Sequence, residues 1–249
     1  MAPRKPNAES TDLSRCDYVA RPRLGIITGS GPEAGMDMWA KLLQENRRRL
    51  GPAFRGDIDA PALSIVSDPE LGLSMELEKT AETVWRALRA DILALNGQVA
   101  AFSIACNTLN LFAGRIRELP LRSEFISFRD VLHDYLQRNG VERACLLGAR
   151  PVAELGQWSP YSDLREVVEF EPVAQGEALH QLIYDIKAFG AADPGVRSRF
   201  AELLASIESA TVLLACTELP LVADIVTDKT LVDVTQLVAE AMLDRCVPL

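Results

Sequence analysis

The chain has 249 residues, 48% of them hydrophobic and 24% charged, so it can bury one large core or two smaller ones. A formal net charge of −9 argues against a nucleic-acid partner, because phosphate binding requires clustered cations. No apolar stretch is long enough to cross a bilayer, and the polar residues 1–20 lack the apolar core of a signal peptide and are expected to be disordered. The five scattered cysteines are therefore expected to be reduced thiols of a cytoplasmic protein.

Short apolar runs alternate with longer amphipathic stretches, a pattern typical of an α/β protein with mostly parallel strands. In the first half, strands are predicted at residues 23–28, 62–66 and 99–105, and a helix at residues 75–96. Pro32 suits the first position of an earlier helix. Apolar residues follow it at helical spacing and are predicted to form the buried face of that helix: Met36, Trp39, Ala40 and Leu43.

The second half repeats this alternation of strands and helices, with strands predicted at residues 124–128, 144–147, 167–170 and 211–215. Helices are predicted between them at residues 130–138, 174–189 and 194–209. Each half opens with a strand that runs into a turn of small residues, Gly29-Ser30-Gly31 in the first and Gly148-Ala149 in the second. This echo predicts two similar sheets that face each other, with a site between the carboxyl ends of their strands.

A later strand in each half ends in a cysteine, Cys106 in the first half and Cys216 in the second. Inverting a stereocentre requires one deprotonated and one protonated group on opposite sides of the carbon, and a thiol pKa of about 8.5 suits both roles. A helix expected to begin at each strand end would stabilise a thiolate and lower its pKa. A cysteine at the end of an apolar strand also fits simple packing, the interpretation given to Cys145. Cys16 and Cys246 have no polar neighbours that suggest a role.

Polar residues follow both cysteines directly, Asn107 and Thr108 after the first and Thr217 and Glu218 after the second. Their side chains and backbone amides are predicted to form an anion site for a substrate carboxylate. The only histidines, His133 and His180, lie on separate predicted helices, and no two cysteines have the close spacing of metal ligands, so no metal site is expected.

Four segments resemble motifs of the aspartate/glutamate racemase family: residues 24–34, 105–108, 182–190 and 215–220. The resemblance implies two pseudo-symmetric Rossmann-like (flavodoxin-like) α/β domains with an active-site cleft between them. It further implies a C-terminal helix that returns to the first domain. Residues 21–120 with 231–249 would then form the first domain, and residues 121–230 the second. A racemase of this kind needs no cofactor, takes a small amino acid and forms a homodimer.

The same resemblance implies roles for individual residues. Cys106 and Cys216 would be the two catalytic bases. The substrate-binding residues would include three that hold the α-carboxylate, two that line the cleft, and a lysine that helps to hold the substrate: Asn107, Thr108 and Thr217, then Ser30 and Gly31, then Lys187. Glu218, in the second cysteine motif, joins this binding set.

The chain departs from the family pattern where the distal carboxylate of the substrate would bind. Many members carry a Pro-Asp-Arg-Thr stretch after the second strand, but residues 67–74 here contain no arginine. A site without that arginine should bind an acidic side chain less well. Lys187 and Arg150 are the candidates to replace the missing charge.

Three alternatives stay open at this stage. Residues 29–34 fit a Gly-x-Gly-x-x-Ala dinucleotide pattern, although Glu33 would place a negative charge near the pyrophosphate and no acidic residue ends a strand about 20 residues on. An isomerase or decarboxylase of small carboxylic acids could share the fold, and two cysteines favour racemisation over decarboxylation. A non-catalytic ligand-binding descendant would also fit the missing arginine.

Overall fold

The computed structural model describes residues 20–246; of the predicted tail over residues 1–20, all but the last residue lies outside this range, Cys16 included. Two parallel four-stranded sheets form the protein, which confirms the predicted α/β fold with two domains. The first sheet has the order β2 (Leu63–Ser67), β1 (Leu24–Thr28), β3 (Ala101–Ile104), β4 (Glu124–Phe125). The second has the order β6 (Glu169–Glu171), β5 (Arg143–Leu147), β7 (Thr211–Leu214), β8 (Thr230–Asp233). The two orders are equivalent strand for strand, so the similarity between the two halves of the sequence corresponds to the same sheet topology in both.

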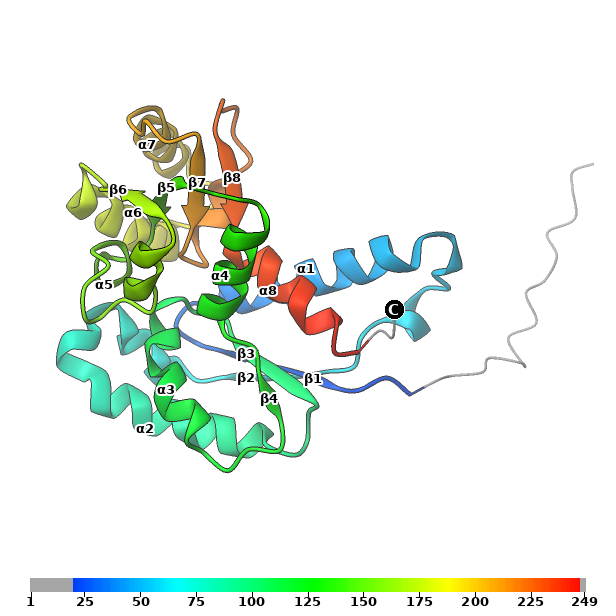
Figure 1. Ribbon diagram of the computed structural model, residues 1–249. Helices are drawn as coiled ribbons and strands as arrows, with labels where there is room; N and C mark the ends of the chain where they lie inside the picture. The colour runs from blue at the N-terminus through cyan, green and yellow to red at the C-terminus, as the bar shows by residue number, and fades with distance from the viewer. Residues whose placement is uncertain (1–19, 247–249) are drawn as a thin grey trace, which may run out of the picture.

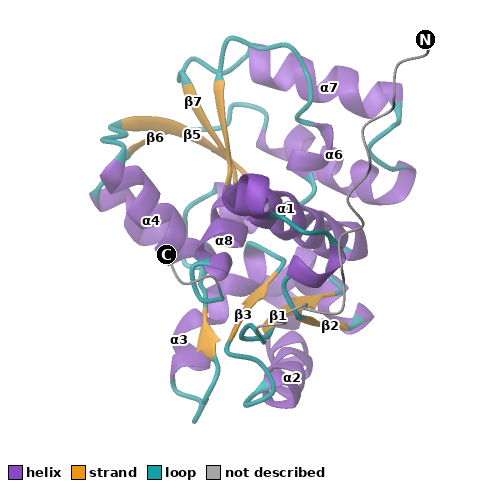
Figure 2. Cartoon of the chain, turned by 90° about the vertical axis from the view of Figure 1, so that its right-hand side faces the viewer, coloured by secondary structure: helices purple, strands orange, loops and turns teal. Residues whose placement is uncertain are grey.

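Helices form three layers around the sheets (Figure 1). The longer helices are α1 (Pro32–Leu50), α2 (Leu77–Leu95), α4 (Phe128–Arg138), α6 (Gly176–Phe189), α7 (Pro194–Ala205) and α8 (Val234–Leu243), and the shorter ones are α3 (Ala113–Arg117) and α5 (Arg150–Ala153). Figure 1 shows α2 and α3 beside the first sheet, and α6 and α7 beside the second. The third layer lies between the sheets, where α8 packs against both α1 and α4 (Figure 2).

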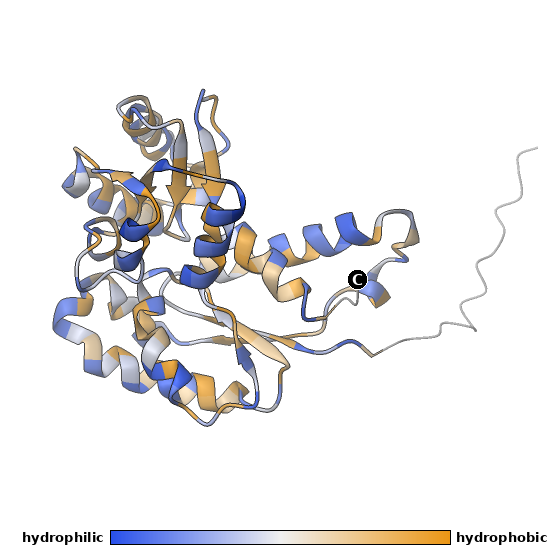
Figure 3. Cartoon of the chain, viewed as in Figure 1, coloured by the Kyte–Doolittle hydropathy of each residue, from blue (hydrophilic) through white to orange (hydrophobic). Residues whose placement is uncertain are grey.

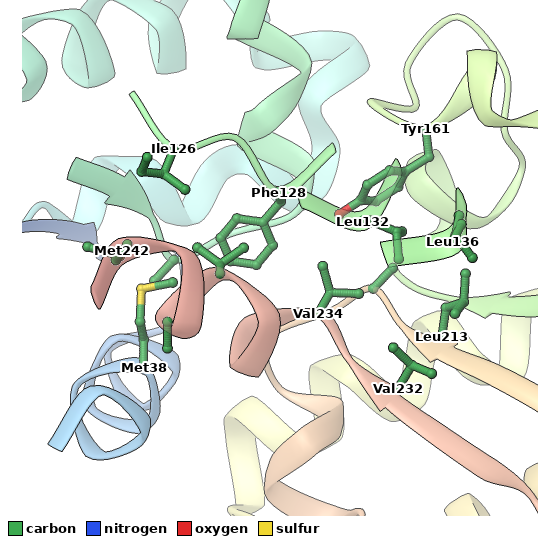
Figure 4. Close-up of a cluster of buried hydrophobic side chains, with 14 of the residues drawn as sticks. Met38, Ile126, Phe128, Leu132, Leu136, Tyr161, Leu213, Val232, Val234 and Met242 are labelled. Atoms are coloured by element: carbon green, nitrogen blue, oxygen red, sulfur yellow. The ribbon is translucent and has the colours of Figure 1, made fainter. Parts of the chain in front are cut away.

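Alternation along the strands distributes apolar side chains between these layers. Ile26 of β1 and Leu146 of β5 point into a central cluster shared by both sheets, whereas their neighbours Ile27 and Leu147 point into separate outer clusters. Figure 3 shows the hydrophobic colouring of the second sheet, and Figure 4 shows part of the central cluster, with Tyr161 at one end. The central cluster therefore ties the two sheets together, and each outer cluster holds helices on one sheet.

The helix after Pro32 exists as predicted, with Pro32 at its start, but its predicted buried face was wrong. Met36 is 67% exposed, and Trp39 and Leu43 are exposed as well. The buried face instead carries Met38, Leu42, Glu45 and Asn46. Glu45 and Asn46 can be buried here because the carboxylate of Glu45 accepts from Arg48 and Arg49, and the amide of Asn46 donates to the carbonyl of Asp59.

The helices predicted to begin at the two cysteines are also different in the structure. A 3-10 segment, η5 (Thr108–Phe112), follows Cys106, and another, η7 (Leu219–Val222), follows Cys216. A single 3-10 turn has few aligned peptide dipoles, so it stabilises a thiolate less than a full α-helix would. No helix within residues 20–246 combines the length and apolar character needed to cross a membrane.

Candidate active site

The two cysteines occupy equivalent positions just beyond the third strand of each sheet order. The preceding residue is bound in the same way in both halves: the amide of Ala105 donates to the carbonyl of Ile27, and the amide of Ala215 to that of Leu147, each at 2.8 Å. Cys106 and Cys216 are each 7% exposed, and each belongs to the outer apolar cluster of its own sheet. Both thiols therefore emerge at the carboxyl edge of a sheet, where open α/β sheets bind ligands.

The glycine turn after β1 provides one wall of the site. Gly29 has a φ of 126°, a conformation that residues with a Cβ rarely adopt, and a Cβ there would collide with the backbone of Asp68. A Cβ at Gly31 would collide with Oε1 of Glu218 and come within 3.0 Å of Nζ of Lys187. Gly31 thus allows residues of the second half to approach the first half closely.

Lys187 and Glu218 form the polar centre of this contact. The Lys187 ammonium donates to Oε1 of Glu218 and to the carbonyl of Ser30, so a helix of the second sheet is tied to the turn after β1. The other oxygen, Oε2 of Glu218, accepts from the Cys216 thiol at 3.0 Å and from the Thr217 hydroxyl at 3.2 Å. Burial lowers the pKa of Lys187, but Glu218 together with Cys216 and Cys106 outweighs it, and the net pKa is raised.

The environment of Cys216 favours the thiol rather than the expected thiolate. Burial raises its pKa well above the ordinary value, and the carboxylate of Glu218 raises it further, while Lys187 acts in the opposite direction. The prediction of a lowered pKa was wrong for this cysteine, because no long helix begins here and a carboxylate faces the sulfur. Burial and the facing carboxylate thus favour the protonated form of Cys216.

In the first half of the chain, the side-chain amide of Asn107 has a donor without a partner among the described residues. Its Oδ1 accepts from the hydroxyl of Tyr161, which is wholly buried and comes from the second half of the chain. Its Nδ2 is buried and has no hydrogen-bond partner among the described residues. An amide donor in this situation costs stability unless a ligand accepts from it, so this orphan atom points to a bound acceptor.

Both sulfurs affect the pKa values of the same two residues, Tyr161 and Lys187. The phenol of Tyr161 has its pKa raised well above the usual value, first by burial and then by Cys106 and Cys216. Both cysteines also contribute to raising the pKa of Lys187. Ser74 lies 3.9 Å from the sulfur of Cys106 through its Oγ. The two thiols are thus part of one electrostatic neighbourhood between the sheets.

A second polar contact crosses between the halves at Glu76, the last residue of the 3-10 segment η4 (Pro69–Glu76). The hydroxyl of Tyr184 donates to its Oε1 at 3.3 Å, and the Arg150 guanidinium lies 3.8 Å from its Oε2. Arg150 also lies 3.8 Å from Glu177, and its amide donates to Nδ1 of His180 at 3.1 Å. Arg150 is therefore already paired with carboxylates of the protein.

The structure brings together most residues that the sequence singled out. Six of them form the contacts described above: Ser30, Gly31, Asn107, Lys187, Thr217 and Glu218. Thr108 is buried at the start of η5. Tyr161, Ser74 and Glu76 were not anticipated, because they lie in irregular or 3-10 segments without a motif. Within residues 20–246, no group of three or more His, Cys, Asp or Glu could hold a metal ion.

Comparison with solved structures identifies the fold as that of aspartate and glutamate racemases. An aspartate racemase from Picrophilus torridus superimposes with a TM-score of 0.74 at 21% identity, covering 90% of this chain and 93% of its own. An aspartate racemase homologue from Pyrococcus horikoshii OT3 gives 0.67 at 21% identity, with 90% and 98% covered. A glutamate racemase from Francisella tularensis, solved with D-glutamate, gives 0.59 at 15% identity, with 90% and 80% covered. No family model and no curated protein matches the chain.

Proposed function

We propose that this protein is a cofactor-independent amino-acid racemase of the aspartate/glutamate racemase family, with Cys106 and Cys216 as its two bases. The shared fold supports the proposal, and the single observation that carries it is the placement of two equivalent cysteines beside one set of polar contacts between the sheets, with an unused amide donor, Nδ2 of Asn107. We further expect the protein to act as a homodimer in the cytoplasm, on the composition and resemblance described above.

Proton transfer would begin with Cys106 as the thiolate and Cys216 as the thiol. Cys106 removes the α-proton from one face of the substrate, and Cys216 delivers its own proton to the opposite face. After the inversion Cys106 is protonated and Cys216 is ionised. The opposite enantiomer therefore reacts through the same two groups in the reverse direction. The hydrogen bond from Cys216 to Glu218 holds the thiol proton in place until the carbanion forms.

Charge develops on the substrate carboxylate when the α-proton leaves, because the electron pair delocalises onto its oxygens. A preorganised donor aimed at that oxygen lowers the barrier, and Nδ2 of Asn107 is such a donor. Tyr161 holds the amide in this orientation by donating to its Oδ1. The Thr217 hydroxyl is already engaged with Glu218, so its part in binding would be through its backbone amide.

The test is exchange of the α-hydrogen of amino acids in heavy water, read by mass spectrometry, together with formation of the opposite enantiomer. We expect Cys106→Ala and Cys216→Ala each to reduce racemisation by about 10²–10⁴-fold or more, since each removes one proton-transfer group. Each single variant should still exchange the α-hydrogen of one enantiomer through its remaining base.

Cys145→Ala is the matched control, because Cys145 is also buried, in the same outer cluster as Cys216, but lies within β5 instead of just beyond the end of a strand. Near-full racemisation by either active-site variant would refute the two-base assignment. Loss of carbon dioxide from the substrate, in place of deuterium uptake, would indicate a decarboxylase instead.

A further inference from the structure

Lys187 and Arg150 are the two cations that the sequence offers to an acidic substrate side chain, and both already have carboxylate partners. Lys187 is paired with Glu218. Arg150 lies between Glu76 and Glu177. His180 accepts a hydrogen bond at Nδ1, and burial and Arg150 lower its pKa, so it remains neutral. No lysine or arginine is among the buried side chains of the part of the chain that the structure describes.

The charge of the site is therefore negative before any substrate enters. One cysteine must be a thiolate for catalysis, Glu218 carries a second negative charge, and Lys187 supplies one positive charge. A zwitterionic amino acid with an uncharged side chain leaves this sum unchanged. Aspartate or glutamate would add another buried carboxylate, which is costly without a paired cation.

Lys187 cannot serve an acidic side chain without a penalty elsewhere. Its ammonium is held by Glu218 and by the carbonyl of Ser30. If Lys187 turned to a second substrate carboxylate, Glu218, itself 4% exposed, would face Cys216 without its cation. Glu218 thus already provides Lys187 with a carboxylate partner, which an acidic substrate side chain would otherwise have to be.

The other neighbours of the thiols are apolar or carry a hydroxyl. Leu71 belongs to the same apolar cluster as Cys106, and Met75 to the same cluster as Cys216. Between them in η4, Ser74 approaches the sulfur of Cys106. This segment supplies aliphatic and hydroxyl groups, and its charged residues, Glu70 and Glu76, are both carboxylates, so it supplies no cation.

We infer that the substrate is an α-amino acid with an uncharged side chain, rather than aspartate or glutamate. The inference rests on the proposed racemase function, and adds to it the substrate class. Its structural basis is the internal pairing of Lys187 with Glu218.

The experiment compares α-hydrogen exchange of alanine, serine and leucine with that of aspartate and glutamate under the same conditions. We expect at least one neutral amino acid to exchange about 100-fold faster than either acidic one, in kcat/KM. Aspartate or glutamate exchanging as fast as the neutral amino acids would overturn this inference while supporting the racemase proposal.

Two glutamate variants test whether the Lys187–Glu218 pair is the cause of the preference for an uncharged side chain. Glu218→Gln leaves Lys187 without its carboxylate, so we expect the ratio of aspartate to alanine exchange to rise at least about tenfold, even where the absolute rates fall. Glu177→Gln is the control, because this carboxylate is 79% exposed and touches only Arg150, so the ratio should not change. An unchanged ratio in Glu218→Gln would contradict the role assigned to the Lys187–Glu218 pair.

A binding measurement separates this inference from the racemase proposal if no amino acid exchanges. Alanine and aspartate would be compared for their ability to slow alkylation of Cys106 and Cys216 by iodoacetamide, followed by peptide mass spectrometry. Protection by alanine at concentrations where aspartate gives none supports the charge argument. Equal or better protection by aspartate overturns it, whatever the reaction proves to be.

Discussion

Replacing Tyr161 by phenylalanine removes one hydroxyl and almost nothing else. The ring is wholly buried in the central apolar cluster (Figure 4), and phenylalanine preserves that packing. The hydroxyl donates to Oδ1 of Asn107, whose Nδ2 already lacks a partner, so the variant leaves the whole buried amide unsatisfied. Such a loss costs about 1–3 kcal/mol of folding free energy. In a protein of this size, a loss of about 2 kcal/mol lowers the melting temperature by roughly 4–8 °C.

The same substitution releases the amide that we assign to the substrate carboxylate. Asn107 would then sample orientations in which Nδ2 no longer faces the substrate. Since this donor binds the carboxylate in the ground state and also stabilises the charge that develops during proton transfer, we expect KM to rise about tenfold and kcat to fall as well. Steady-state racemisation assays, run well below the melting temperature of the variant, measure the two constants separately from stability.

Tyr135→Phe is the matched control. Tyr135 packs against the same central cluster, but its hydroxyl makes no hydrogen bond among residues 20–246. It should retain both the melting temperature and KM. If Tyr161→Phe also retained both, Tyr161 would be only a packing residue and the assigned orientation of Asn107 would be wrong. A lower melting temperature with unchanged KM would likewise separate Asn107 from substrate binding.

Two further predictions test the geometry and the electrostatics of the first half. Gly31→Ala should lower α-hydrogen exchange, because the new Cβ would displace the carboxylate of Glu218 from its place beside Lys187 and Cys216. Gly114→Ala, whose Cβ meets nothing within 4 Å, should retain the exchange; equal activities would show that the position of this carboxylate is not needed. Burial, with a smaller effect of Asp68, raises the pKa of Asp91 to about 6, so the folded state holds this proton more tightly than the unfolded state does. The free energy of unfolding should therefore fall as the pH rises from about 4 to about 6, and urea titrations should show that Asp91→Asn removes this decline; the same slope in both proteins would disprove the assignment.

The fold was largely predictable because strand and helix periods are local properties of the sequence. The error on α1 shows where this reasoning ends. Periodicity placed its exposed apolar residues on the buried face, but Glu45 is buried instead, neutralised by hydrogen bonds from Arg48 and Arg49. Asn46 is buried in the same way, through the carbonyl of Asp59. Pairing with distant or adjacent partners decides which face is buried, and a hydrophobic pattern does not record it.

The site was predictable only where motifs carry it. The cysteines and the residues directly after them lie at strand ends that the sequence revealed, and the resemblance supplied Lys187. Tyr161 had no such signal, because it precedes a single 3-10 turn and its only mark is the need of a buried hydroxyl for a partner. The raised pKa of the Cys216 thiol could not be predicted either, because it depends on a carboxylate whose orientation the sequence does not give.

Contacts between the two halves make each half responsible for positioning polar groups of the other. Tyr161 of the second half orients Asn107 of the first, while the Ser30 carbonyl of the first half holds Lys187 and, through it, Glu218 beside Cys216. If the halves separated, the amide donor would lose its orientation and the thiol would lose the setting that keeps it protonated. The proposed two-base mechanism would therefore require the two halves to be in contact during proton transfer.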